Sequence, residues 1–159
     1  MKSKKDNIAE YVLYLWQMED VVRALADDER LHSDTFLSEL SQMMHAEGVL
    51  TAGHTQIARV AQQEMEELHA HLLDTNAIYK GAFMQLMPQL NILKSRSDNP
   101  TQSDIEMMLV FLYNIMLLHL QRRPISEQTL AVQQQVSKLL QMLSAAYKND
   151  DYYDDQATL

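Results

Sequence analysis

The chain has no cysteine and few residues that break helices, with only three glycines and three prolines among its 159 residues. Without cysteine it forms no disulfide, no cysteine-ligated zinc or iron–sulfur site and no catalytic thiol. Three glycines also leave no glycine-rich loop of the kind that cradles phosphate groups. These absences exclude disulfide-stabilised scaffolds and several large classes of enzyme.

Positive charge is scarce as well. The chain has 13 lysines and arginines against 22 aspartates and glutamates, which gives a formal net charge of −9. Proteins that bind nucleic acids or anionic membranes non-specifically need surplus cations to replace counterions. We therefore expect neither a nucleic-acid partner nor a membrane partner.

Long apolar runs are missing too. The most apolar stretch, residues 105–120, contains Glu106, Asn114 and His119 and falls short of the about 20 residues that span a bilayer. The basic N-terminus is not followed by an apolar run long enough for a signal peptide. We predict a cytoplasmic protein.

Apolar residues recur with a helical period along almost the whole chain, and no segment alternates with the period of a β-strand. The predicted fold is all-α: a single-domain bundle of five or six mostly antiparallel helices at residues 1–149, followed by an acidic, tyrosine-containing tail at residues 150–159. Capping residues and chain breaks place the helices at about residues 7–26, 34–47, 55–73, 76–94, 103–121 and 126–147. The segments 55–73 and 76–94 are alternatively one long bent helix.

Two predicted helices have informative apolar patterns. The helix at 55–73 is expected to turn one stripe inward, formed by Ile57, Val60, Ala61, Met65, Leu68 and Leu72. The helix at 103–121 is apolar nearly all round, which is typical of a helix in the middle of a bundle. His119, near its end, is expected to be a core or boundary residue.

Two Glu-x-x-His pairs, Glu29 with His32 and Glu66 with His69, have the spacing at which a helix presents a carboxylate and an imidazole to one metal ion. The first pair falls in a polar break between helices. In the second pair, Glu66 lies on the face away from the apolar stripe and is expected to point to solvent. We therefore predict solvated side chains, no metal site and no cofactor.

Two further patterns resemble metal-binding motifs but are better explained as ordinary surface residues. Glu67 and His71 are four residues apart and are expected to form a hydrogen-bonded pair on a helix surface. The run Asp150-Asp151-Tyr152-Tyr153-Asp154 matches the string by which prenyl-diphosphate enzymes hold magnesium, but no second acidic motif completes such a site. An acidic tail explains this run better.

Polar residues interrupt the first helix directly after its most apolar part. Trp16 is followed by Glu19, Asp20 and Arg23, and Glu19 and Arg23 stand in the favourable order for an ion pair within a helix. One interpretation is a structural polar cluster at the end of the bundle. The other is a small cleft lined by Trp16, Glu19 and Arg23. Together with Asp20, these three residues are the candidate ligand or interaction site, and no residue is predicted to be catalytic.

The same helix carries a family resemblance. The segment from Ile8 to Ala24 resembles the opening of a family of small all-helical proteins of unknown function found mainly in Bacteroides-type bacteria. Leu68-His69, Leu112-Tyr113 with Leu117-Leu118, and Pro124-Ile125-Ser126 fit the same family. The resemblance implies an all-helical fold over essentially the whole chain and brings no assigned activity.

The molecular function stays open between two classes. We predict an adaptor or regulatory module that acts through contacts with a protein partner or through self-association. The alternative is a small-ligand binder or an enzyme with a cleft near Trp16, Glu19 and Arg23. An exposed apolar patch on a solid core would favour the first class, and a concave cavity around those three residues would favour the second.

Overall fold

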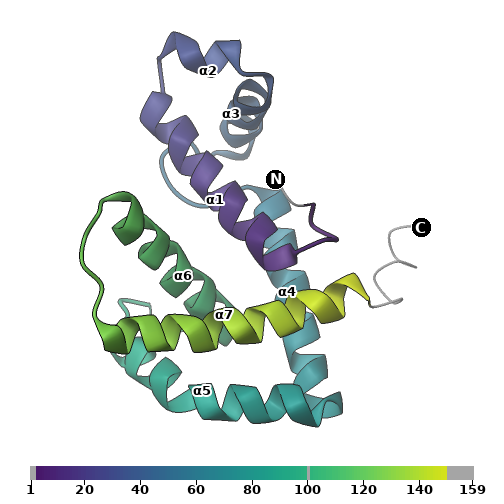
Figure 1. The fold of residues 1–159 in the computed structure, drawn as a ribbon. Helices are drawn as coiled ribbons and strands as arrows, with labels where there is room; N and C mark the ends of the chain where they lie inside the picture. The colour runs from purple at the N-terminus through teal and green to yellow at the C-terminus, as the bar shows by residue number, and fades with distance from the viewer. Residues whose placement is uncertain (1–2, 100, 150–159) are drawn as a thin grey trace.

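The structure, a computed structural model, describes residues 3–99 and 101–149. These residues form seven α-helices and no strand (Figure 1), so the predicted all-α class is confirmed. The helices are α1 (Ile8–Leu25), α2 (Glu29–Ser33), α3 (Thr35–Glu47), α4 (Gln56–Thr75), α5 (Ala77–Ser95), α6 (Asp104–Leu120) and α7 (Glu127–Lys148). The predicted tail, residues 150–159, lies outside the described residues.

The ends of the helices follow the capping side chains in the sequence. Each of Asn7, Ser103 and Ser126 accepts a hydrogen bond from the backbone N–H three residues further on, at the starts of α1, α6 and α7. Gly48 ends α3 in the left-handed conformation, with a φ of 72°. Asn76 has an extended backbone and caps α5, so α4 and α5 are two helices and not one bent helix.

The predicted count of five or six helices is wrong because of α2. This helix has five residues and buries only Leu31, so it is too short to show a periodic apolar pattern. Local hydrogen bonds define it instead. The side chain of Asp28 accepts from the Arg30 N–H at its start, and that of Asp34 accepts from the Leu37 N–H at the start of α3.

The helices form two packed groups that share α1 (Figure 1). The first half of α1 joins α4, α5, α6 and α7 around the main core, whereas its second half packs with α2 and α3 around a smaller one. The smaller core consists of Val22, Leu31, Leu40 and Met44. In the larger group α4 runs across α7 and then turns into α5, so the arrangement departs from a mostly antiparallel bundle.

Two apolar patterns are buried differently from the prediction. Ile57 and Val60 of α4 are exposed, whereas the other four residues of the predicted stripe are buried, together with Ala58. Helix α6 contacts α1, α4, α5 and α7, as expected of a central helix, but its second half buries only Ile115. Its last residue, Leu120, is 64% exposed. None of the described helices is both long enough and apolar enough to cross a bilayer.

Candidate functional site

Glu19 is completely buried where the two packed groups meet. Its Oε2 accepts hydrogen bonds from the backbone N–H of Thr55, at 2.9 Å, and from the Thr55 hydroxyl, at 2.8 Å. Its Oε1 lies 2.7 Å from Nδ1 of His54. Because Thr55 is the N-cap residue of α4, these bonds fix the start of α4 to the middle of α1.

The surroundings of Glu19 favour its charged form. Burial alone would raise the pKa of this carboxyl, because desolvation penalises a charge. The hydrogen bonds from His54 and Thr55 outweigh burial, so the pKa of Glu19 lies below its ordinary value. The group is therefore a carboxylate whose two oxygens both accept hydrogen bonds.

Trp16 closes one side of this arrangement. Its ring stacks on His54 with a centroid distance of 4.5 Å, and Tyr113 of α6 packs edge-on against it at 5.8 Å. The Tyr113 hydroxyl donates a hydrogen bond to Asp20. Burial, together with the neighbouring Asp20 carboxylate, raises the pKa of Tyr113, so its hydroxyl stays protonated and able to donate.

Arg23 attaches the α3–α4 loop to α1. Its guanidinium donates to Asp20 at 3.0 Å, to the carbonyl of Val49 at 2.9 Å and to the carbonyl of Gly53. Gly53 has a φ of 93°, a conformation that side chains rarely allow. The predicted ion pair between Glu19 and Arg23 is wrong, since Glu19 turns inward to the start of α4 and Arg23 turns toward the loop.

The structure thus brings Trp16, Glu19, Asp20 and Arg23 together in one polar network, defined here as these four residues with His54, Thr55 and Tyr113. Trp16 and Glu19 are buried beneath their neighbours and present no surface to a ligand. The network holds α1, α4, α6 and the α3–α4 loop together. A ligand-binding role for it stays a prediction. Sequence reasoning missed His54, whose one signal was its place directly before the N-cap residue of a helix.

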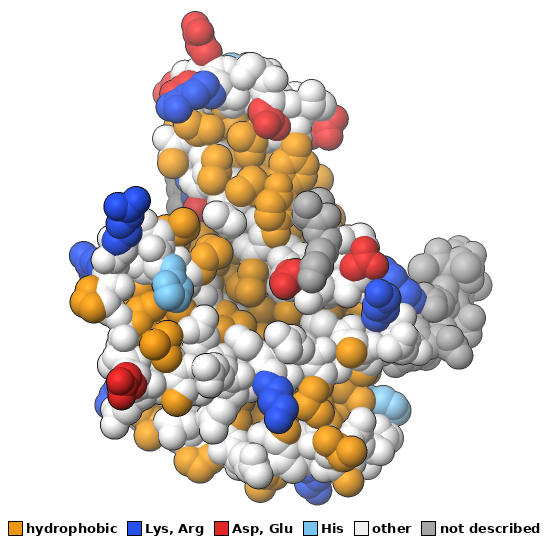
Figure 2. Space-filling view, viewed as in Figure 1, with side chains coloured by type: hydrophobic (Ala, Val, Ile, Leu, Met, Phe, Trp, Pro, Cys, Tyr) orange, Lys and Arg blue, Asp and Glu red, His pale blue; other side chains and the backbone are white. Residues whose placement is uncertain are grey.

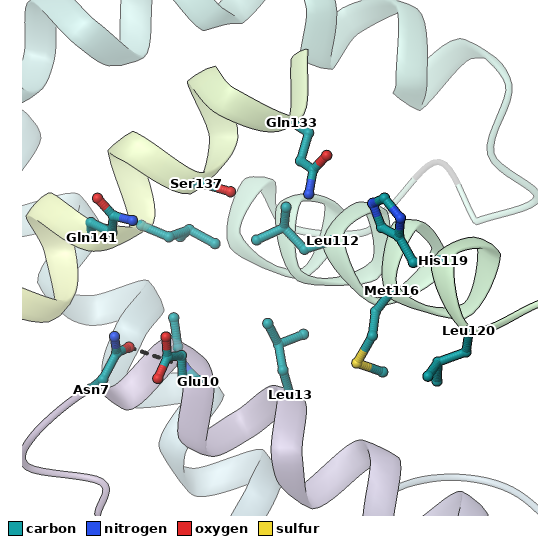
Figure 3. A pocket seen from close by; sticks show the side chains of 12 residues that line it. Asn7, Glu10, Leu13, Leu112, Met116, His119, Leu120, Gln133, Ser137 and Gln141 are labelled. Atoms are coloured by element: carbon teal, nitrogen blue, oxygen red, sulfur yellow. Dashed lines mark hydrogen bonds between the residues drawn. The ribbon is translucent and has the colours of Figure 1, made fainter. Parts of the chain in front are cut away.

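An open apolar groove of about 470 Å³ lies between α1, α6 and α7. Leu13 from α1, with Leu112 and Met116 from α6, point into the space between the helices (Figure 3). Figure 2 shows apolar side chains gathered in this hollow. Its polar lining residues are Asn7, Glu10, His119, Gln133, Ser137 and Gln141. His119 is therefore exposed at the groove and is not a core or boundary residue as predicted.

The sequence contained one signal for this groove. Helix α6 has no polar face, so its apolar residues on every side require cover. The first half of α6 is covered by the other helices, whereas the side chains of Leu112, Met116 and Leu120 face the open groove.

The second Glu-x-x-His pair also lies differently from the prediction. Glu66 is partly buried and accepts a hydrogen bond from the Ser103 hydroxyl, so it links α4 to the start of α6. His69 is buried, with Nδ1 2.6 Å from the Tyr79 hydroxyl and its ring edge-on to Phe83. No three His, Asp or Glu side chains in residues 3–99 and 101–149 converge to hold a metal ion.

The predicted surface pair of Glu67 and His71 is replaced by a different contact. The Gln63 side chain donates to Glu67 at 3.4 Å, one turn earlier on the same helix. Both Glu67 and His71 are exposed.

We expect the buried His69 to make the protein sensitive to mild acid. Burial lowers the pKa of His69, and Asp104 opposes this only in part. An unfolded histidine has a pKa of about 6.5, so below that pH the unfolded chain binds more protons than the folded one. The free energy of unfolding should therefore fall as the pH drops below about 6.5, as measured by urea unfolding at a series of pH values.

Two variants on α4 test whether His69 causes this loss of stability in mild acid. His69→Gln should flatten the profile between pH 5 and pH 7, whereas His71→Gln, at an exposed position, should leave it unchanged. An NMR titration gives the pKa of His69 directly. A value at or above the ordinary histidine pKa of about 6.5 would contradict the expectation.

The fold and the two sites define a small all-helical protein with a buried polar network and an open apolar groove. The chain belongs to the family described as a domain of unknown function, DUF4924, which it matches over residues 1–31 and 25–154. This match covers nearly the whole chain and confirms membership of an uncharacterised family, although it indicates no specific function. Comparisons with curated proteins and with solved structures find no similar chain.

Proposed function

We propose that this protein is a cytoplasmic interaction module of bacterial, Bacteroides-type origin, whose groove receives apolar side chains from a helix of a partner protein. The observation that carries the proposal is the side of the second half of α6 that lines the groove and is left uncovered. Its Met116 and Leu120 line the open groove beside Leu13 of α1. A contiguous apolar surface of this kind is typical of a protein contact site.

The form of the groove favours a short amphipathic helix. Gln133 and Gln141 mark its extent along α7, and eight residues of helix correspond to about 12 Å, or roughly two turns. A partner helix of that length offers apolar side chains at positions i, i+3, i+4 and i+7. Among the residues that the structure describes, the polar lining contains the carboxylate of Glu10 and no lysine or arginine. This lining and the net charge of −9 together favour a partner helix with basic rather than acidic flanks.

The test is selection of helical peptides from a displayed library, followed by fluorescence polarisation with the chosen sequences. We expect amphipathic sequences with micromolar or tighter affinity. Leu120→Lys should weaken their binding at least tenfold, because it places a charge in the apolar groove. Ile57→Lys, a matched change at an exposed apolar position of α4, should leave binding unchanged. Equal binding by wild type and Leu120→Lys, or failure to select any such peptide, would overturn the proposal.

A small apolar ligand is the second candidate occupant. Its support is the groove volume of about 470 Å³, which lies within the range of small-molecule pockets, about 300–1,000 Å³. Native mass spectrometry of protein isolated from its host distinguishes the two. A co-purifying small molecule that is lost in Leu120→Lys would favour the ligand over the helix.

A further inference from the structure

The outward face of α5 is apolar and carries no charge along its centre. Ile78, Met84 and Ile92 are 78%, 57% and 45% exposed. The whole helix contains no aspartate or glutamate, although the chain has 22 of them. The positions Ile78, Gly81, Gln85, Pro88 and Ile92 are alternately three and four residues apart, so they form one stripe along the helix, here called the α5 stripe.

The two ends of the α5 stripe are placed symmetrically about its central residue, Gln85. Ile78 and Ile92 each lie seven residues from Gln85. When two copies of α5 meet antiparallel across a two-fold axis at Gln85, Ile78 of each copy meets Ile92 of the partner copy. This is the self-complementary pattern that a two-fold interface requires. A Cβ added at Gly81 meets nothing within 4 Å, so the surface there is open to a neighbouring backbone.

The charges beyond the ends of the stripe suit the same pairing. Asp74 is exposed just before the N-terminal end of α5, and Arg96 is exposed just after its C-terminal end. Neither forms an ion pair with another described residue. These two residues are also equidistant from Gln85, so the antiparallel arrangement brings Asp74 of one copy toward Arg96 of the other. An uncharged face is moreover where two copies of a chain with a net charge of −9 repel each other least.

We propose that the α5 stripe is a self-association face through which two copies of this chain pair antiparallel. Helix α5 has 19 residues and is therefore about 28 Å long. A single helix pair of that length covers less than the about 800 Å² per partner of a standard interface. The dimer is accordingly reversible, with a dissociation constant in the micromolar range. The groove lies between α1, α6 and α7, so the two surfaces are independent (Figure 1).

Because the chain has no cysteine, a single introduced thiol reports on the two-fold axis without background. Gln85→Cys should form a disulfide-linked dimer on mild oxidation at about 100 µM protein. Gln135→Cys, the same change at an exposed position of α7, should remain monomeric. Equal cross-linking of the two variants would overturn the proposal.

Analytical ultracentrifugation tests the direction of pairing. Wild type should dimerise with rising concentration, and Ile78→Glu or Ile92→Lys alone should raise the dissociation constant at least tenfold. The double variant should recover to within about threefold of wild type. In it, each introduced carboxylate faces the introduced ammonium group of the partner copy. These changes are at exposed positions, and circular dichroism checks that each variant is folded. A wild type that stays monomeric to 500 µM, or a double variant as weak as the single ones, would refute antiparallel pairing.

Discussion

Replacing Glu19 with alanine is expected to lower the free energy of unfolding by about 3 kcal/mol or more. The change leaves the Thr55 N–H and hydroxyl and the His54 Nδ1 without their acceptor. A buried donor that loses its partner costs about 1–3 kcal/mol by itself, so the loss at Glu19 exceeds that of a typical surface residue. Unfolding in urea, followed by circular dichroism, measures the difference.

The matched control is Glu67→Ala, which removes an exposed glutamate from α4 and should change stability by less than about 0.5 kcal/mol. Glu19→Ala should also alter the response to strong acid. Since the folded pKa of Glu19 is lowered, its stabilisation is present above the unfolded pKa of about 4.3 and is lost as the pH falls through the folded pKa. A Glu19→Ala protein as stable as Glu67→Ala would show that the polar network does not hold α1 and α4 together.

Leu109→Ala should destabilise the protein by about 3 kcal/mol, within the range of 2–5 kcal/mol for leucine removed from a core. Leu109 is completely buried in the first half of α6, among residues from several helices. Leu120→Ala, the same substitution eleven residues further along the same helix, should cost less than about 0.5 kcal/mol because Leu120 is largely exposed. Urea unfolding of the two variants under identical conditions gives the comparison.

The difference between Leu109→Ala and Leu120→Ala also tests whether the groove beside α6 is open. A selected peptide that binds there should raise the stability of wild type and Leu109→Ala alike, because ligand binding to the folded state adds to its free energy of unfolding. A loss for Leu120→Ala as large as that for Leu109→Ala would mean that the second half of α6 is packed as core. The proposed interaction surface would then be absent.

The ends of the helices could be predicted from the sequence because they depend on neighbours. Asn7, Ser103 and Ser126 cap helices through bonds to residues three positions away, and Gly48 ends one through its own backbone. The short helix α2 could not be predicted from periodicity, since five residues with one buried leucine show no repeat.

Only those residues of the polar network that lie on α1 could be predicted from the sequence. Trp16, Glu19, Asp20 and Arg23 lie within eight residues, so any helix brings them close together. The partners of Glu19 are His54 and Thr55, which lie 35 and 36 residues away. The partner of Asp20 is Tyr113, which lies 93 residues away. No spacing rule connects such positions.

The sequence by itself determined the all-α class, most of the helix boundaries and the apolar character of α6, because these follow from local hydrogen bonding and from composition. The tertiary structure alone decided which side chains meet. It buried Ala58 of α4 and left the more hydrophobic Ile57 and Val60 exposed, and in the second half of α6 it buried only Ile115. Burial depends on how closely neighbouring helices approach each face of a helix. That approach is set by all the packed helices together and not by the pattern of any one of them.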